Sequence, residues 1–264
     1  MVHAYRGVGK THCSIGIGCA VASGRKFLNW EAISAETVLL IDGEMPAAIL
    51  QSRLMDHMRM TTGTSTLPEK LRIMTPDLQK EGMPDIGMRL GQNKIEKFIG
   101  DDVKLVILDN LSTLMRTGAE NEADSWLSLQ QWGLRLRARG KSVLYIHHSG
   151  KNGSQRGSSR KEDVLDTVIC LQHPKNYKPE QGACFEIHYE KARGLYGNDV
   201  KPFEARLMDG QWLTRSINQS NYDKAVALLK DGYTQRDIVE ELGLSKGYIS
   251  KINKKALAKG DLHA

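Results

Sequence analysis

The sequence predicts an α/β fold with a mainly parallel sheet, followed by a small all-α module. Two observations lead to this prediction. Short apolar runs alternate with helical stretches between residues 12 and 146, and every segment from residue 222 onward has a helical pattern. Strands separated by helices need crossover connections, which produce parallel pairing. We therefore divide the chain into a large domain (1–213), a linker (214–221) and a helical module (222–264).

The apolar runs are predicted to be buried strands, because each is only four or five residues long and is bounded by turn-forming residues. Helices are expected between them, with glycine at their ends or proline in the first turn. We expect strands at 37–41, 71–74, 104–108 and 142–146, and helices at 12–23, 46–59, 91–98 and 124–139. Three later runs, at 166–171, 185–189 and 202–207, look more like hairpin strands.

Composition restricts the setting and the partners. The chain has 264 residues and a formal net charge of +6, which fits a nucleic-acid partner, although solvated lysines give the same balance. Its four cysteines lack zinc spacing, and Cys13 and Cys19 lie in an apolar helical pattern, where cysteine acts as a small hydrophobe. We therefore expect a reducing, cytoplasmic setting. No stretch approaches the roughly 20 apolar residues of a membrane helix, so no membrane partner is expected.

A glycine-rich loop opens the first expected helix and predicts an ATP site. It ends in Gly-Lys-Thr, where glycines let backbone N–H groups approach phosphates and the helix N-terminus adds favourable partial charge. Lys10 is expected at the β- and γ-phosphates, and Thr11 is expected to bind Mg²⁺. The strict motif has glycine where Ala4 stands, so the match is incomplete. The predicted nucleotide-binding residues are Gly7, Val8, Gly9, Lys10, Thr11 and His12.

Two carboxylates follow expected strands and complete this chemistry. Asp109 comes directly after 104–108, where a Walker B aspartate holds Mg²⁺, often through water; a helix or turn cap is the alternative. Glu44 follows 37–41, where a carboxylate can orient the attacking water. Asp42 is a weaker competitor for that role, and both could simply be solvated loop residues.

Later strands add three further candidate catalytic residues. His147 and His148 end the strand at 142–146 and point to opposite faces, so at most one faces the nucleotide; we favour His148, with a satisfied core histidine as the alternative. Lys191 and Arg193 follow a late strand, where an arginine could stabilise phosphoryl charge in a neighbouring subunit, or simply be solvated.

Several short motifs occur in an order that resembles a known family. They resemble the RecA-like ATPase domain of RepA-type hexameric replicative helicases and their phage and bacterial relatives, over about residues 4–207. The motifs are Gly7-Val-Gly-Lys-Thr11, Asp42-Gly-Glu-Met-Pro46, Leu105-Val-Ile-Leu-Asp-Asn110, Ile146-His-His148, Arg156-Gly-Ser-Ser159 and Lys191-Ala-Arg193. The resemblance implies a ring, usually a hexamer, with ATP between subunits. By this analogy Glu44 is the base, Asp109 the Walker B residue, His148 the sensor, and Lys191 and Arg193 the finger of the next subunit.

The resemblance also implies a channel-facing loop and exposes one departure. Basic residues of that loop are expected to track a single DNA strand: Lys151, Arg156, Arg160 and Lys161. A solvated basic loop is the alternative. A phosphate loop normally follows a β-strand, and only residues 1–4 precede this one. We therefore predict that the first strand is missing and that the start is truncated or misassigned.

The helical module has helix-turn-helix spacing. Thr234 is a good N-cap, and Gly243-Leu-Ser245 supplies a turn and a second cap before the helix expected at 246–259. The module looks similar to resolvase-type and sigma-type helix-turn-helices, and a three-helix bundle for protein contacts is the alternative. The residues expected to face duplex DNA are Lys246, Tyr248, Ser250, Lys251 and Lys254.

These features predict an ATP- and Mg²⁺-dependent DNA motor of the replicative-helicase class. Two alternatives stay open: an ATP-switched DNA-binding regulator without unwinding activity, and a truncated, inactive ATPase that still binds DNA.

Overall fold

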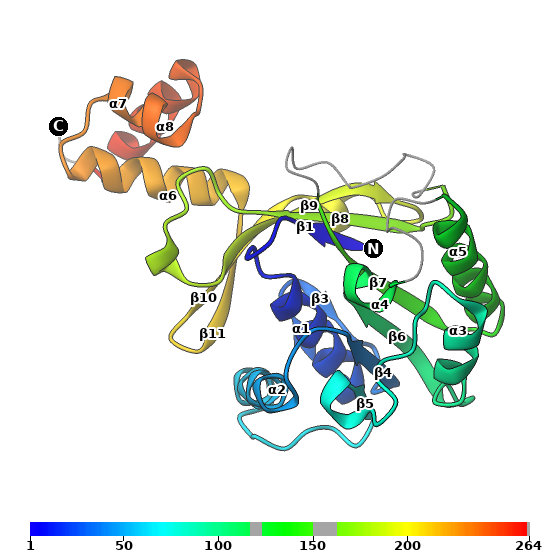
Figure 1. The fold of residues 1–264 in the computed structure, drawn as a ribbon. Coiled ribbons are helices and arrows are strands. Elements are labelled where there is room, and N and C mark those ends of the chain that lie inside the picture. The colour runs from blue at the N-terminus through cyan, green and yellow to red at the C-terminus, as the bar shows by residue number, and fades with distance from the viewer. Residues whose placement is uncertain (117–122, 150–162, 263–264) are drawn as a thin grey trace.

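A nine-stranded sheet organises the large domain in the computed structural model, which describes residues 1–116, 123–149 and 163–262 (Figure 1). The spatial order is β11-β10-β9-β8-β1-β7-β6-β4-β5. The parallel strands are β1 (Val2–Ala4), β4 (Thr37–Asp42), β5 (Leu71–Met74), β6 (Val103–Asp109), β7 (Ser142–His148) and β8 (Thr167–Gln172). Antiparallel strands extend one edge: β9 (Cys184–Ala192), β10 (Phe203–Met208) and β11 (Gln211–Ser216). The predicted mainly parallel α/β fold is confirmed.

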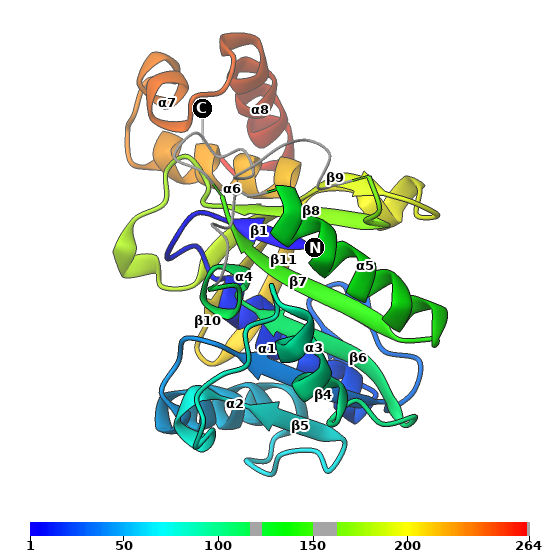
Figure 2. The same cartoon turned by 45° about the vertical axis from the view of Figure 1, so that its right-hand side comes forward.

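Helices cover both faces of the parallel part (Figure 2). Helices α1 (Lys10–Ser23) and α2 (Ala47–Thr62) pack with one apolar cluster, which also holds the small β2 (Lys26–Phe27) and β3 (Trp30–Glu31) hairpin. The second cluster lies on the other face, against α3 (Arg89–Glu96), α4 (Leu111–Leu114) and α5 (Ala123–Ala138). Short 3₁₀ turns occur at Pro76–Leu78, Pro179–Gln181 and Gly197–Val200.

The first strand is present, which corrects the sequence prediction. β1 has only three residues, but it lies between β7 and β8, with Val2 opposite Ile146 and Ile169. All three residues of β1 are buried. Three residues were too few to show a strand pattern in the sequence. Pairing on both sides supplies the hydrogen bonds that such a short segment cannot obtain alone.

The region predicted as a linker is instead regular structure. Residues 214–221 form the end of β11 and the start of α6 (Ile217–Lys230). The Ser216 side chain caps α6 by accepting from the N–H of Gln219, so strand and helix are directly joined. The polar composition reflects a two-stranded sheet edge whose side chains are mostly exposed.

The C-terminal unit contains α6, α7 (Gln235–Leu242) and α8 (Lys246–Lys259) around their own apolar cluster. Thr234 and Ser245 cap α7 and α8, and Gly243 between them has φ 59°. The unit docks on the last strands of the sheet, where Lys224 of α6 and Glu204 of β10 form a 2.5 Å ion pair (Figure 1). Glu204 is buried, so this pair links the two units more firmly than an exposed pair would.

None of the helices in the described part of the chain combines the length and apolar character needed to cross a bilayer.

Candidate nucleotide-binding site

A cleft of about 680 Å³ lies at the carboxyl edge of the parallel strands. Its walls come from the loop after β1, the first turn of α1, and the segments after β4, β6 and β7. Predicted site residues in its lining are Gly7, Gly9, Lys10, Thr11, His12, Glu44, Asp109 and His148. In open α/β sheets, ligands bind at this edge. Val8 lies beneath the loop, buried in the core.

The glycines of the loop have conformations that other residues rarely adopt. Gly7 has φ +82° and Gly9 has φ +123°. A Cβ atom on Gly9 would lie 2.8 Å from the ring of Phe185 in β9, so the loop backbone rests directly on that ring. Phe185 is fully buried and was not singled out in the sequence, because nothing in a strand pattern reveals which loop crosses it.

Lys10 turns back onto its own loop. Its ammonium group donates to the carbonyl oxygens of Ala4 at 3.1 Å and Tyr5 at 3.0 Å. Burial lowers the pKa of Lys10 to about 8, although the carboxylates of Asp109 and Glu44 act in the opposite direction. The group is therefore a cation held among acceptors, ready to exchange carbonyl partners for phosphate oxygens.

Asp109 ends β6 in a buried position, and the Ser14 hydroxyl donates to its Oδ2 at 2.5 Å. Burial raises the pKa of Asp109 to about 6, and the nearby Asp42 and Glu44 carboxylates add to the rise. Ser14 was missed in the sequence, although it lies one helical turn beyond Lys10 and so faces the same way.

Asp42 and Glu44 have different surroundings. The backbone N–H groups of Glu44 and Met45 both donate to Oδ1 of Asp42, at 2.8 Å and 2.6 Å, so Asp42 shapes the turn after β4. Glu44 instead accepts a 2.7 Å hydrogen bond from the side chain of Asn110 and lines the cleft. Asn110 also went unnoticed in the sequence. This arrangement favours Glu44 over Asp42 as the group that meets a nucleotide-bound water.

The two histidines at the end of β7 point in different directions. His148 lines the cleft, whereas His147 is buried opposite His3 of β1. His12 also lines the cleft, and its Nδ1 is 3.3 Å from Nε2 of buried His57. Burial lowers the pKa of both His12 and His57, the latter to about 3, so this pair is uncharged near neutral pH.

Lys191 and Arg193 do not reach this cleft. β9 runs antiparallel to β8, so its end lies at the opposite edge of the sheet. There Arg193 pairs with Asp166 at 3.2 Å, and Lys191 donates to the carbonyl oxygen of Asp163 at 3.3 Å. Within one chain, neither side chain can touch a nucleotide held by Lys10.

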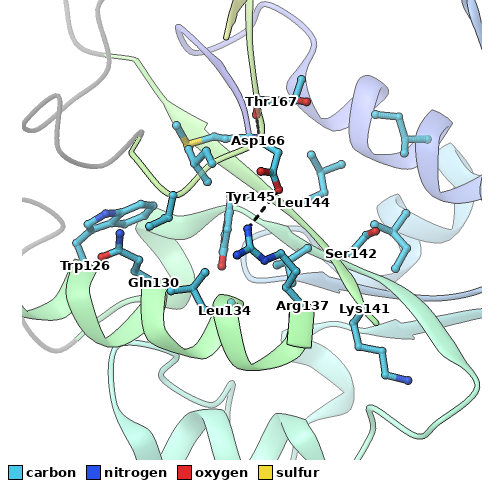
Figure 3. Close-up of a pocket in the computed structure, with 17 residues that line it drawn as sticks. Trp126, Gln130, Leu134, Arg137, Lys141, Ser142, Leu144, Tyr145, Asp166 and Thr167 are labelled. Carbon is cyan, nitrogen blue, oxygen red and sulfur yellow. Dashed lines mark hydrogen bonds and ion pairs between the residues drawn. The ribbon is translucent and has the colours of Figure 1, made fainter. Parts of the chain in front are cut away.

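A second cavity of about 380 Å³ opens at that opposite edge, between α5 and the first residues of β7 and β8 (Figure 3). Trp126, Leu134 and Tyr145 line it, and Arg137 and Asp166 form an ion pair at its rim. The described residues that line it include neither a glycine-rich loop nor a helix N-terminus. The phosphate chemistry therefore belongs to the carboxyl-edge cleft.

The predicted DNA-facing residues fall into two groups. Lys151, Arg156, Arg160 and Lys161 lie outside the described residues. On α8, Lys246, Lys251 and Lys254 are exposed and Ser250 is half-buried. Tyr248 is held against α6 by a 3.3 Å hydrogen bond from its hydroxyl to Asn218.

Residues 1–154 match the sequence model of the family described as the AAA domain. The chain belongs to that family. The match covers the phosphate loop, the turn after β4, and β6 and β7, which are the segments that build the cleft. No curated protein matches the sequence at a significant level.

Solved structures show the same fold around this AAA domain. One of them, an ATPase domain, superposes with a TM-score of 0.57 and 14% identity, over 80% of this chain and 82% of that one. The KaiC-like protein PH0186 from the hyperthermophilic archaeon Pyrococcus horikoshii OT3 gives a TM-score of 0.56 and 12% identity, over 81% and 87%. The fold is that of RecA-like P-loop ATPases.

The cleft fits Mg²⁺-ATP by its own chemistry. The positive φ of Gly7 and Gly9 opens the loop backbone toward the cleft, and Lys10 supplies a cation there. Asp109, Asp42 and Glu44 concentrate negative charge, which a divalent cation neutralises. Mg²⁺ usually takes one or two protein oxygens, with phosphate and water completing its shell, so Thr11 and Asp109 suffice.

Proposed function

We propose that this chain is an ATP-hydrolysing RecA-like motor that acts on DNA, of the plasmid or phage replicative-helicase type. One observation carries the ATPase part: Lys10, Glu44, Asp109 and His148 follow four different strands and line one cleft. Membership of the AAA domain family supports the same reading.

Each residue has a role that its surroundings support. Lys10 and the loop N–H groups hold the phosphates, and Thr11 and Asp109 hold Mg²⁺, which supplies charge neutralisation when bound. Glu44 takes a proton from the attacking water, while Asn110 keeps its carboxylate directed into the cleft. His148, one residue before Ser149 and the basic segment that follows it, senses the state of the site and passes it along the chain.

The position of Arg193 supports assembly into a ring. Arg193 and Lys191 lie at the edge of the sheet away from their own cleft, so they serve a nucleotide only when a second subunit brings them to it. We therefore propose a homo-oligomeric ring with ATP between subunits.

DNA is proposed to bind at two places. Exposed lysines of α8 contact duplex DNA, with the capped α7 and α8 in the helix-turn-helix arrangement. The basic residues of 150–162 contact single-stranded DNA.

The docking of α6 favours a second candidate, an ATP-switched DNA-binding regulator. The buried pair of Lys224 and Glu204 connects the helical unit to the sheet that carries the nucleotide site. In this reading ATP changes DNA affinity, and the protein unwinds nothing.

Steady-state ATP hydrolysis with and without single-stranded DNA tests the proposal, with Lys10→Ala as the blank. We expect DNA-stimulated turnover in the wild type and none in the variant. Turnover equal to the blank would contradict the motor, and would leave the inactive DNA-binding reading. Hydrolysis without strand displacement in an unwinding assay would favour the regulator.

A further inference from the structure

Four side chains of metal-binding types form a row across four neighbouring strands. The strand registers place His188 of β9 opposite Cys170 of β8, Cys170 opposite His3 of β1, and His3 opposite His147 of β7. Residues in register share one face of a sheet. The row lies on the face away from α1, because Val2 and Ala4, on either side of His3, pack into the cluster around α1.

A β-bulge brings a carboxylate to this row. Val168 pairs with Lys191 and Ile169 pairs with Tyr189, so Glu190 is an extra residue in β9. Bulges redirect side chains. Oε2 of Glu190 therefore crosses β8 and lies 2.7 Å from Nε2 of His3. The ligand atoms of His3, Cys170 and Glu190 all lie within 4.8 Å of one another.

We propose that His3, Cys170 and Glu190 form a binding site for a divalent transition-metal ion of the Zn²⁺ class. Imidazole nitrogen, thiolate sulfur and carboxylate oxygen are the ligand types that Zn²⁺ takes in proteins. The site differs in kind from the magnesium site, since Mg²⁺ prefers oxygen ligands alone. It also lies on the opposite face of β1 from α1 and its phosphate loop.

The surroundings of His3 support a ligand role. Its Nδ1 is 2.8 Å from the hydroxyl of Ser149, and Ser149 is itself fixed by a 2.9 Å backbone hydrogen bond to Ala4. A second partner on the other ring nitrogen is what orients metal-binding histidines in general. His3 and Ser149 are both buried, so the ring is held with Nε2 directed at Glu190.

Charge balance also favours binding. The Cys170 thiol loses its proton to solvent as the sulfur–metal bond forms, while His3 stays neutral and Glu190 is ionised. One thiolate and one carboxylate cancel the two positive charges of the ion, so no net charge is left on this partly buried face. The Glu190 side chain is 41% exposed, which leaves a side open for entry and for a water as fourth ligand.

The ion would tie three strands together where the fold is shortest. β1 has three residues and leads directly into the phosphate loop, so a bond from His3 to β8 and β9 fixes the strand that carries Lys10. The metal would therefore raise the melting temperature of the protein without entering the nucleotide cleft.

Cobalt titration of the full chain tests the site. The protein is used without a polyhistidine tag, reduced, and freed of metal with a chelator. We expect one equivalent of Co²⁺ to produce a thiolate-to-cobalt charge-transfer band and the visible bands of a four-coordinate ion, and Zn²⁺ to remove both. Cys170→Ser should abolish the charge-transfer band, and Cys184→Ser, which removes a buried cysteine of β9, should keep it.

Two further variants keep the test independent of folding. Glu190→Gln preserves the shape of a half-exposed side chain and should weaken Co²⁺ binding. Ser149→Ala should lower the affinity by about 10- to 100-fold through the orientation of His3. The proposal is overturned if folded wild-type protein gives no thiolate band, if the band survives Cys170→Ser, or if Glu190→Gln binds Co²⁺ as tightly as the wild type. ATP hydrolysis is not a readout here, so its absence leaves this test unaffected.

Discussion

The hydroxyl of Ser14 donates a 2.5 Å hydrogen bond to Oδ2 of Asp109, joining α1 to the end of β6. Both side chains are buried, so the contact replaces hydrogen bonds that water would otherwise supply. It connects the helix that begins at the phosphate loop with the carboxylate proposed to hold Mg²⁺.

Ser14→Ala should therefore weaken both the fold and magnesium use. Loss of a donor to a buried carboxylate costs about 1–3 kcal/mol in the free energy of unfolding. Urea unfolding measures that cost, and the Mg²⁺ dependence of ATP hydrolysis should shift to higher concentration. Ser23→Ala is the matched control, because Ser23 lies in the same helix and its hydroxyl donates to backbone carbonyls there. Equal effects of the two substitutions would contradict a role for Ser14 at Asp109.

Asp109→Asn should stabilise the protein without ligand, in a pH-dependent way. The pKa of Asp109 is raised from 3.8 to about 6, mainly by burial. The folded state therefore holds the proton more tightly, and stability falls as pH rises through this window. Near neutral pH the ionised carboxylate opposes folding by an amount on the order of 2 kcal/mol. The asparagine removes that cost and still accepts from Ser14.

Melting temperatures of wild type and Asp109→Asn across this pH range measure the effect. The variant should melt higher near neutral pH, and the difference should vanish as pH falls toward the usual aspartate value of 3.8, below the window. Asp101→Asn, at an exposed position before the same strand, is the control and should show no such trend. A constant difference at all pH values would mean that Asp109 does not titrate in this window. The same variant should lose Mg²⁺-dependent hydrolysis.

The sequence pattern predicted the parallel strands because each is a compact apolar run, and the strand ends located Lys10, Glu44, Asp109 and His148. Contacts between distant segments carry no such pattern. The support of Gly9 by Phe185 depends on how β9 lies beside β8, and the pairing of Ser14 with Asp109 depends on the packing of α1 on the sheet. β1 was missed for the same reason, since neighbours rather than its own three residues make it a strand.

Glu44→Gln should separate catalysis from binding. The amide can still accept from Asn110, so the turn keeps its shape, but it cannot take a proton from water. The turnover number should fall by about 100- to 10,000-fold, while nucleotide affinity stays near that of the wild type. Nucleotide binding by fluorescence and hydrolysis by phosphate release measure the two quantities. Glu36→Gln, just before β4, is the control; full activity in Glu44→Gln would return Asp42 to consideration.

Duplex binding should depend on the exposed lysines of α8. Lys251→Ala and Lys254→Ala should each weaken binding and reduce the slope of log affinity against log salt by about 1, because each removes one phosphate contact. Lys230→Ala, at the end of α6, is the matched control for a lost surface charge. Fluorescence anisotropy over a salt series gives the slopes. Unchanged slopes would favour a helical bundle used for protein contacts.

Arg193 and Glu44 should complement each other between subunits. If Arg193 acts on a neighbouring nucleotide, Arg193→Ala and Glu44→Gln are each inactive alone but together form some interfaces with Glu44 from one subunit and Arg193 from the next. Mixing the two variants should therefore restore part of the hydrolysis. Arg137→Ala is the control, because Arg137 also pairs with Asp166, at 3.7 Å, but is proposed to have no role at the nucleotide. It should keep activity alone. If the mixture stays as inactive as its components while both variants bind nucleotide and assemble with each other, Arg193 does not act across the interface, and the ring loses its main structural support.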